Sequence, residues 1–300
     1  MKPLCIYHAS CVDGFGAAWV VREHFGGVVD FYAARYNEIP PEVRGRHVII
    51  VDFSYKRDVL VSMAIAAKSI LVLDHHLSAM KDLEGLDHAA TSWTKHMNRV
   101  EFDETQGSDS LYVLFDMSRS GAGLTWDFFF GPVPRPMLIN HIEDRDLWRF
   151  KMPDTRSVSA SLFSYPYDFS VWDRLMDQTH YQIMAHEGVA ILRKEQKDLK
   201  EILAIATQEF TIQGHRIPAA NVPYMMASEA GNELCKGRPF AATYYVDKDG
   251  LYNFSLRSSE DGLDVSEIAK MYGGGGHKHA AGFKVPGTIA RMFELEDSHG

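Results

Sequence analysis

The sequence predicts an α/β protein in which an N-terminal parallel sheet flanked by helices is joined by a long connecting helix to a smaller α/β C-terminal domain. Short apolar runs alternate with segments of helical spacing in the N-terminal part, as in a parallel sheet. Residues 181–210 contain no proline and only Gly188, which favours one long helix. With 300 residues, the chain exceeds what a single hydrophobic core usually serves.

The N-terminal elements follow from these patterns. Residues 48–51 form a continuous β-branched run, typical of a strand buried on both faces. Strands are predicted at residues 4–7, 28–34, 48–51 and 69–73, and helices at 14–24, 57–68 and 124–147, the last broken around 131–134.

The C-terminal part is predicted to begin after the long helix. Residues 240–246 and 251–257 are strand-like and flank Asp-Lys-Asp-Gly at 247–250, a hairpin turn signal. We therefore expect one domain over 1–180, the connecting helix over 181–210, and a second domain over 211–300.

Composition limits the classes of function. Lys and Arg number 31 against 40 Asp and Glu, giving a net charge of −9, which argues against binding long duplex nucleic acid. The three cysteines have no paired spacing, and the N-terminus has no signal-peptide pattern, so we expect a cytoplasmic protein. The most apolar stretch, 59–73, is too short to span a membrane.

Potential metal ligands follow the predicted strands. Ligands of open parallel sheets collect at the carboxyl ends of strands, and carboxylates with imidazoles suit Mn²⁺ or Mg²⁺. A lone Asp after a strand is more often a helix cap, but Asp-His-His after an apolar strand serves no packing purpose. The candidates are His8, Asp13, Asp52, Asp74, His75, His76, Asp144 and Asp146.

A second polar cluster lies near the C-terminus. Four glycines at 273–276 precede His277, Lys278 and His279, and an apolar strand follows. Glycine lets backbone amides approach an anion closely, which favours phosphate binding over a flexible linker. Arg257, at the end of a predicted strand, could equally serve an ion pair or a phosphate.

Together these segments resemble the DHH superfamily of phosphoesterases, in the branch with a DHH-associated C-terminal domain. The resemblance spans residues 8–283, and its order and spacing are specific. It rests on Tyr7-His8-Ala9-Ser10-Cys11-Val12-Asp13-Gly14, Val51-Asp52-Phe53-Ser54, Leu73-Asp74-His75-His76, the segment around Asp144, the strand ending at Arg257 and the glycine–histidine run.

The resemblance implies that 1–180 is a metal-binding catalytic domain, that 211–300 is a substrate-binding domain, and that the active-site cleft lies between them. It also implies a role for each matched residue. The resemblance implies two Mn²⁺ ions bridged by Asp52. Their implied ligands are His8, Asp13, Asp52, His75 and Asp144. Asp74 is implied to orient a histidine, and His76 to act near the scissile phosphate. The implied phosphate clamp consists of Arg257, Ser258, Gly274, Gly275, Gly276, His277 and His279.

Two positions stay open. Many family members carry Asp where this chain has Cys11, and a thiol binds Mn²⁺ poorly and softer ions better. The alternatives are a weaker first metal, a different metal such as Zn²⁺, Co²⁺ or Mg²⁺, or Cys11 as a non-ligand with water in its place. Asp144 aligns better with the family than Asp146, which is the reserve candidate.

The resemblance implies a metal-dependent phosphodiesterase, of exonuclease type, that hydrolyses its substrate with a metal-activated water. The acidic chain favours short oligonucleotides, dinucleotides or nucleoside bisphosphates. Two alternatives are an exopolyphosphatase or pyrophosphatase, and a nucleotide-binding regulator whose metal centre has decayed at Cys11. The oligomeric state stays open, with a homodimer as one option.

Overall fold

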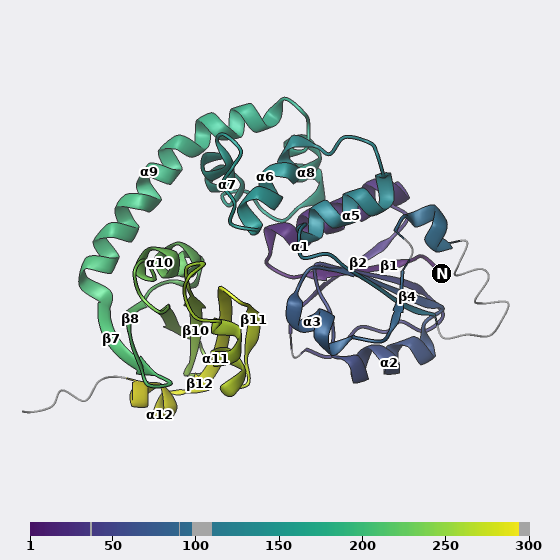
Figure 1. The fold of residues 1–300 in the computed structure, drawn as a ribbon. Helices are drawn as coiled ribbons and strands as arrows, with labels where there is room; N and C mark the ends of the chain where they lie inside the picture. Colours follow the sequence, from purple (N-terminus) through teal and green to yellow (C-terminus); the bar gives the residue numbers. More distant parts are fainter. Residues whose placement is uncertain (37, 90, 98–109, 294–300) are drawn as a thin grey trace, which may run out of the picture. The chain divides into compact units, whose positions relative to one another are not determined.

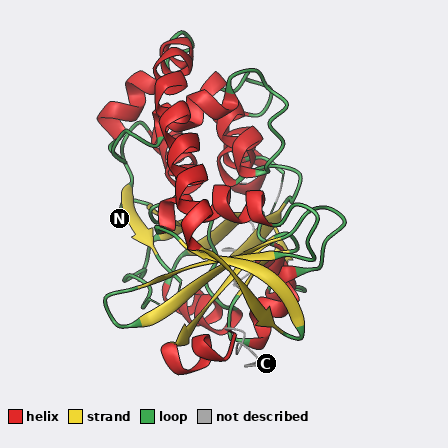
Figure 2. Cartoon of the chain, turned by 90° about the vertical axis from the view of Figure 1, so that its left-hand side faces the viewer, coloured by secondary structure: helices red, strands yellow, loops and turns green. Residues whose placement is uncertain are grey.

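A computed structural model describes residues 1–36, 38–89, 91–97 and 110–293. The chain divides into two compact units, Met1–Leu192 and Arg193–Gly300. Figure 1 follows the chain through both units, and Figure 2 distinguishes the strands (yellow) from the helices (red). We take the units in turn.

The first unit is built on a six-stranded sheet in the order β2-β1-β3-β4-β6-β5. Every pairing in it is parallel, which confirms the fold class that the sequence predicts. Because β1 pairs with both β2 and β3, the strand order reverses at β1, and ligands of such sheets bind beside this reversal. The strands are β1 (Leu4–His8), β2 (Asp30–Ala34), β3 (His47–Val51), β4 (Ser69–Asp74), β5 (Asp87–His88) and β6 (Leu111–Phe115).

Helices cover both faces of this sheet (Figure 1). Successive side chains of a strand point to opposite faces, so Ile49 and Val51 pack under α1 and α5, whereas Val48 and Ile50 pack over α2. The helices are α1 (Val12–Phe25), α2 (Arg57–Ala66), α3 (Leu77–Asp82), α5 (Gly121–Phe130), α6 (Met137–Asp146), α7 (Thr155–Leu162) and α8 (Phe169–Leu175).

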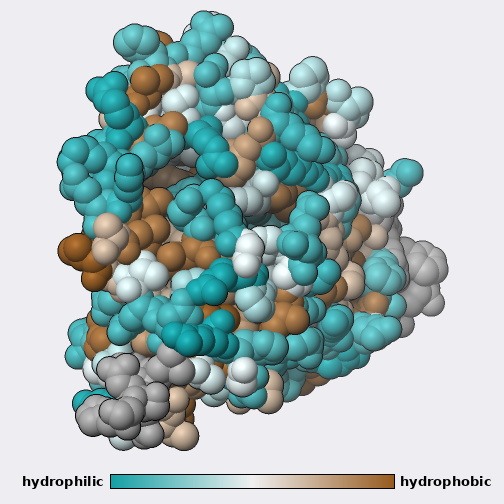
Figure 3. Space-filling model, turned by 60° about the vertical axis from the view of Figure 1, so that its left-hand side comes forward, coloured by the Kyte–Doolittle hydropathy of each residue, from teal (hydrophilic) through white to brown (hydrophobic). Residues whose placement is uncertain are grey.

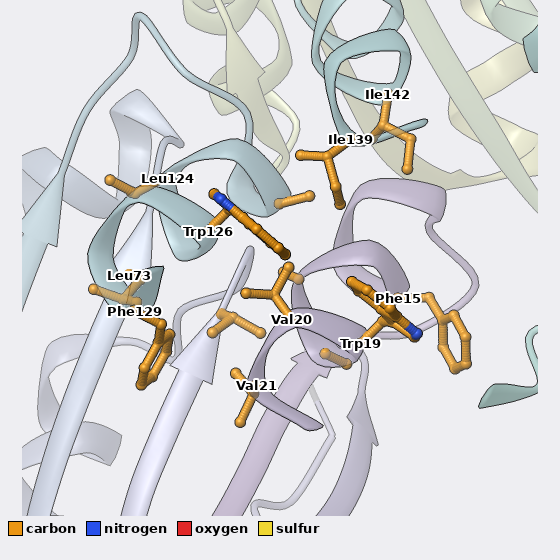
Figure 4. Packing of buried hydrophobic residues seen from close by; sticks show 14 of the residues in the cluster. Phe15, Trp19, Val20, Val21, Leu73, Leu124, Trp126, Phe129, Ile139 and Ile142 are labelled. Carbon is orange, nitrogen blue, oxygen red and sulfur yellow. The ribbon is translucent and has the colours of Figure 1, made fainter. Parts of the chain in front are cut away.

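The larger core of this unit joins α1, α5, α6 and the sheet. Figure 4 shows Val20 of α1 among side chains from α5 and α6, with Leu73 of β4 nearby. This packing fixes the start of α1 and the start of α5 against the strand ends. Those two helix starts carry residues of the candidate site.

The long helix α9 (His180–Ala206) ends earlier than the sequence predicts. Residues 207–210 belong instead to strand β7 (Thr207–Ile212), which pairs antiparallel with β8 (His215–Asn221). Thr207 and Thr211 are β-branched and prefer a strand, and the Thr207 hydroxyl donates to the carbonyl of Leu203 at 2.7 Å, which closes the last helical turn.

The second unit has a six-stranded sheet in the order β11-β12-β10-β9-β8-β7. The predicted hairpin is present, because β9 and β10 pair antiparallel across the turn that contains Gly250. Its remaining elements are β9 (Ala241–Val246), β10 (Leu251–Arg257), β11 (Gly275–His277), β12 (Ala280–Pro286), α10 (Ala227–Leu234), α11 (Val265–Met271), α12 (Gly287–Ala290) and the 3₁₀ turns η1 (Tyr224–Met226) and η2 (Arg291–Phe293).

On the face drawn in Figure 3, hydrophilic residues cover most of the surface and hydrophobic residues form patches between them. Within the described part of the chain, no helix combines the length and hydrophobicity that crossing a membrane requires.

Candidate functional site

The carboxyl ends of β1, β3 and β4 bring the first group of predicted residues together. These strands are neighbours in the sheet, with β3 in the middle. His8 is the last residue of β1, Asp52 follows β3, and Asp74 ends β4 directly before His75. Three segments that are distant in sequence therefore present ligand-type side chains at one edge.

One group of donors consists of His8, Cys11 and Asp52, whose ligand atoms all lie within 4.8 Å of one another. Oδ2 of Asp52 is 3.6 Å from Nδ1 of His8 and 3.5 Å from Sγ of Cys11. Nδ1 of His8 is buried and has no hydrogen-bond partner within the described segments. A buried nitrogen without a partner costs free energy unless a ligand or ion completes it.

A second group consists of Asp13, His75 and Asp146, again within 4.8 Å. Nε2 of His75 lies 3.7 Å from Oδ2 of Asp13 and 3.6 Å from Oδ2 of Asp146. The same Nε2 is 3.1 Å from Oδ1 of Asp52. One oxygen of Asp52 thus faces the first group and the other faces the second, which is the arrangement a bridging carboxylate requires.

The backbone of Asp52 adopts a left-handed conformation, with φ of 52°. Asp tolerates this region better than most residues, and such conformations concentrate at functional sites. The amide of Asp52 donates to the carbonyl of Leu73 at 3.0 Å, so the turn after β3 stays tied to β4. The carboxylate is thereby held at the strand end, and its side chain is only 2% exposed.

The start of α5 holds Asp13. The amides of Gly121 and Ala122 donate to the two carboxylate oxygens of Asp13 at 2.5 and 2.9 Å. A helix N-terminus stabilises a carboxylate through its free amides and its dipole. The sequence interpretation missed this contact, for which the only signal is the run of small residues after Ser120.

Gly121 also lies against Asp52. A Cβ atom at Gly121 would stand 2.4 Å from Cβ of Asp52, closer than any real contact. The glycine is therefore needed for the helix start to approach the central carboxylate.

Asp74 orients the two histidines that follow it. Its Oδ1 accepts the amide of His75 at 2.7 Å and that of His76 at 3.3 Å, and lies 2.7 Å from Nδ1 of His76. Asp74 is fully buried, whereas the side chain of His76 is 18% exposed. Because Nδ1 of His76 is turned to Asp74, Nε2 is the ring nitrogen that can serve another group.

The nearby buried carboxylates raise the pKa values of His75 and His76. Burial alone would lower the pKa of His75, but its hydrogen bond to Asp52 and the charges of Asp146 and Asp13 raise that pKa to about 10. Burial likewise opposes the protonated form of His76, and the charge and hydrogen bond of Asp74 raise its pKa to about 9. Both imidazoles therefore carry a proton at neutral pH when no metal competes for them.

The pKa values of the carboxyl groups of Asp13 and Asp52 are shifted in opposite directions. Burial raises the pKa of Asp13, and the negative charges of Asp52 and Asp146 raise it further. Burial would also raise the pKa of Asp52, but its hydrogen bond to His75 and the nearby imidazole of His8 hold that pKa well below the usual value. The central carboxylate is thus the one most firmly kept in its charged form.

The preference for Asp144 over Asp146 as a ligand is not supported by the geometry. Oδ1 of Asp144 accepts the amide of Lys151 at 2.9 Å, and Oδ2 accepts the amide of Met152 at 3.0 Å and the hydroxyl of Thr155 at 2.7 Å. Asp144 therefore ties the loop after α6 to α7 and belongs to none of the metal-ligand groups found among the described residues. Asp146, at the end of α6, stands in the second group.

Tyr36 is a neighbour of the site that the sequence interpretation missed. Its ring lies 5.4 Å from that of His8 and 4.8 Å from that of Phe53, measured between centroids. No sequence pattern marks this residue, because the contact depends on the turn after β2 passing beside the end of β1.

In the second unit, Arg257 and His277 both pair with Ala280, one from each side of β12. Directly opposite residues of antiparallel strands share a face, so the two cationic-type side chains flank one small residue on the same face. A guanidinium nitrogen of Arg257 donates to the hydroxyl of Ser228 in α10 at 2.8 Å.

The other predicted clamp residues have structural contacts. The hydroxyl of Ser258 donates to the carbonyl of Leu263 at 2.7 Å and lies 2.9 Å from Nδ1 of His279. The glycine run forms the edge strand β11, where a Cβ at Gly274 would lie 2.1 Å from the carbonyl oxygen of Gly282, and one at Gly276 would lie 2.5 Å from that of Ala280. No such contact constrains Gly275.

Comparison with known proteins gives a match to the DHHA1 domain over residues 220–295. An uncharacterised protein of Acanthamoeba polyphaga mimivirus is 29% identical over 98% of this chain and 70% of its own length. Oligoribonuclease NrnB of Bacillus subtilis is 41% identical over 69 residues, which are 23% of this chain and 17% of that protein.

Among solved structures, RecJ of Thermus thermophilus in complex with Mn²⁺ is similar in fold, with a TM-score of 0.50 and 13% identity over 96% of this chain and 50% of that one. The described segments of this chain also hold His, Cys and carboxylate groups that could bind a metal ion. Residues 220–295 therefore match the DHHA1 domain, and the fold of the chain is similar to that of RecJ.

Proposed function

We propose that the protein is a Mn²⁺-dependent phosphodiesterase that hydrolyses short oligonucleotides, dinucleotides or nucleoside bisphosphates. The observation that carries this proposal is the placement of Asp52, whose two carboxylate oxygens face two separate groups of metal-ligating side chains. Paired divalent sites joined by a carboxylate are typical of enzymes that cleave phosphate esters.

The residues fit two divalent cations. His8, Cys11 and Asp52 would hold one, and Asp13, His75 and Asp146, together with Asp52, would hold the other. When bound, such ions lower the pKa of a water molecule and offset charge on phosphoryl oxygens. The unpartnered Nδ1 of His8 and the crowding of carboxylates around His75 both support occupation by cations.

His76 is the proposed proton donor. Its Nδ1 is turned to Asp74, and its pKa of about 9 keeps it protonated near neutral pH. It is also more exposed than Asp74, so its Nε2 can reach a bound substrate. A positioned imidazolium can transfer its proton to the leaving oxygen as the ester bond breaks. Asp74 positions the ring and stabilises its charge.

Arg257 and His277 are proposed to bind a substrate phosphate. They share one face of the second sheet on either side of Ala280, and Ser228 orients the guanidinium. Arg binds phosphate through a planar fork of N–H donors. Ser258 and His279 support this region by contacting each other, and Gly274, Gly275 and Gly276 let β11 approach β12.

The preference for a short oligonucleotide is supported by the relative named as an oligoribonuclease, although that similarity covers only 69 residues. The net charge of −9 is also unfavourable for following a long polyanion. A cytoplasmic location accords with the absence of paired cysteines from the sequence.

The test is a substrate panel with Mn²⁺, Mg²⁺, Co²⁺ and Zn²⁺. Dinucleotides, short oligoribonucleotides and a nucleoside bisphosphate are compared with polyphosphate and pyrophosphate. We expect hydrolysis of the nucleotide substrates, with loss of at least about a hundredfold in kcat for Asp52→Ala and His76→Ala. Cleavage of polyphosphate or pyrophosphate alone would contradict the proposed substrate class. Unchanged turnover in Asp52→Ala would contradict the proposed bridging role.

A further inference from the structure

We propose that the two halves of the metal centre select different cations, so that the protein is a mixed-metal enzyme. The group His8–Cys11–Asp52 takes a softer ion such as Zn²⁺ or Co²⁺, and the group Asp13–His75–Asp146 takes a harder ion such as Mn²⁺. This inference rests on the proposed function only in placing metals at this site, because it concerns which ions bind and not which bond is cleaved.

The donor atoms of the two groups differ in kind. The first group offers one imidazole nitrogen, one sulfur and one carboxylate oxygen. The second offers one imidazole nitrogen and two carboxylates, with Oδ1 of Asp52 close by. Thiolate ligands favour Zn²⁺ and other soft ions, whereas carboxylate-rich sites suit Mn²⁺ and Mg²⁺.

The thiol of Cys11 is directed into the site. Cys11 precedes the first residue of α1, and its carbonyl accepts the amide of Phe15 at 3.0 Å, which anchors its backbone. Its Sγ lies 3.5 Å from Oδ2 of Asp52, the oxygen that also faces His8. A cysteine that served only as an apolar filler would be expected against hydrophobic side chains, as Cys5 is.

The other two cysteines provide matched controls. Cys5 is buried within the larger core of the first unit, and Sγ of Cys235 lies near the carbonyl of Asn232 in the second unit. Neither belongs to a metal-ligand group within the described residues. Cys5→Ala and Cys235→Ala therefore remove a thiol without changing the donors around Asp52.

The experiment titrates the metal-free full-length protein with Co²⁺ and records its absorption spectrum. Sulfur-to-cobalt charge transfer gives an intense near-ultraviolet band that oxygen and nitrogen ligands do not give. We expect this band in the wild-type protein and in Cys5→Ala and Cys235→Ala, and its loss in Cys11→Ser and Cys11→Asp. The affinity of the first Co²⁺ should fall about tenfold or more in Cys11→Ser.

Metal content provides a second readout. After equilibration with one equivalent of Zn²⁺ per chain and a large excess of Mn²⁺, followed by removal of free ions, we expect one of each ion per wild-type chain. Cys11→Asp should shift toward two Mn²⁺, because it replaces sulfur by a hard oxygen donor. Circular dichroism verifies that each variant is folded, and Cys11→Asp preserves the test if Cys11→Ser does not fold.

An unchanged Co²⁺ spectrum in both Cys11 variants would overturn the inference, as would two ions of the same kind in the wild-type protein. These outcomes are independent of the proposed activity. If the protein shows the sulfur-to-cobalt band but cleaves no phosphodiester, the mixed-metal inference stands and the proposed function is wrong. If the protein cleaves phosphodiesters but does not show the band, only the mixed-metal inference is wrong.

Discussion

The backbone amide of Gly121 donates a hydrogen bond to Oδ2 of Asp13 at 2.5 Å, although 108 residues separate the two in the chain. The contact joins the start of α5 to a candidate metal ligand at the start of α1. Because Gly121 also lies directly against Asp52, a single position controls the placement of two carboxylates. The metal centre therefore depends on helix packing as well as on its ligands.

Gly121→Ala should weaken metal binding. The added Cβ would lie 2.4 Å from Cβ of Asp52, so either α5 or the Asp52 side chain has to move. We expect Mn²⁺ affinity to fall about tenfold or more by isothermal titration calorimetry. Gly16→Ala is the control, because its added Cβ would meet Ala122 and Ile142 at 3.2 and 3.3 Å without touching Asp52. Equal losses of affinity in the two variants would argue against a specific role for Gly121.

Asp144→Asn and Asp146→Asn should have different effects. Asp146→Asn removes an oxygen donor near His75 and should lower Mn²⁺ affinity about tenfold or more. Asp144→Asn weakens contacts to Lys151, Met152 and Thr155, and should lower the free energy of unfolding by about 1–3 kcal/mol while metal affinity persists. Chemical denaturation and calorimetry measure the two quantities. If Asp144→Asn abolished metal binding in a folded protein, the assignment of Asp146 would be wrong.

Metal affinity should rise with pH. His75, with a pKa raised to about 10, carries a proton at neutral pH in the metal-free protein, and this proton has to leave before Nε2 can bind a cation. Losing one proton predicts an increase in Mn²⁺ affinity of about tenfold per pH unit below that pKa. Calorimetry in two buffers of different ionisation enthalpy measures the protons released. An affinity that stays constant between about pH 6 and 8 would contradict this prediction.

In the metal-free protein, the contribution of His75 to the free energy of unfolding should decrease as the pH rises. A folded-state pKa raised above the ordinary value near 6.5 stabilises the fold fully below about pH 6.5, and this contribution disappears as the pH rises toward about 10. Urea denaturation of metal-free wild-type protein and of His75→Gln gives the difference at each pH. The difference should shrink as the pH increases.

Arg257→Gln should raise KM for the proposed substrates by about tenfold or more with little effect on kcat. The guanidinium would contact a phosphate that is not the reacting one, so its interaction is equal in the ground and transition states. Arg216→Gln is the control, because Arg216 lies in the same unit with a side chain that is 69% exposed. A fall in kcat with unchanged KM would place Arg257 in the chemical step instead.

Several features of the fold follow from local sequence. The runs at 48–51 and 69–73 are apolar on both faces, and the structure places both in the interior of a parallel sheet. Asp-Gly after a strand-like segment specified the hairpin between β9 and β10. The end of α9 was harder to place, because Thr207 and Thr211 lie in a segment whose strand conformation depends on pairing with β8.

The sequence by itself determined the parallel sheet, the types of ligand at its strand ends and the resemblance to a phosphoesterase family, because these depend on short-range patterns of polarity and residue type. Only the tertiary structure decided that Asp146 faces His75 whereas Asp144 binds backbone amides, and that Gly121 supports Asp13 and Asp52. The physical reason is that residues two apart on a helix point in different directions, and the packing of α5 and α6 selects which one meets the strand ends.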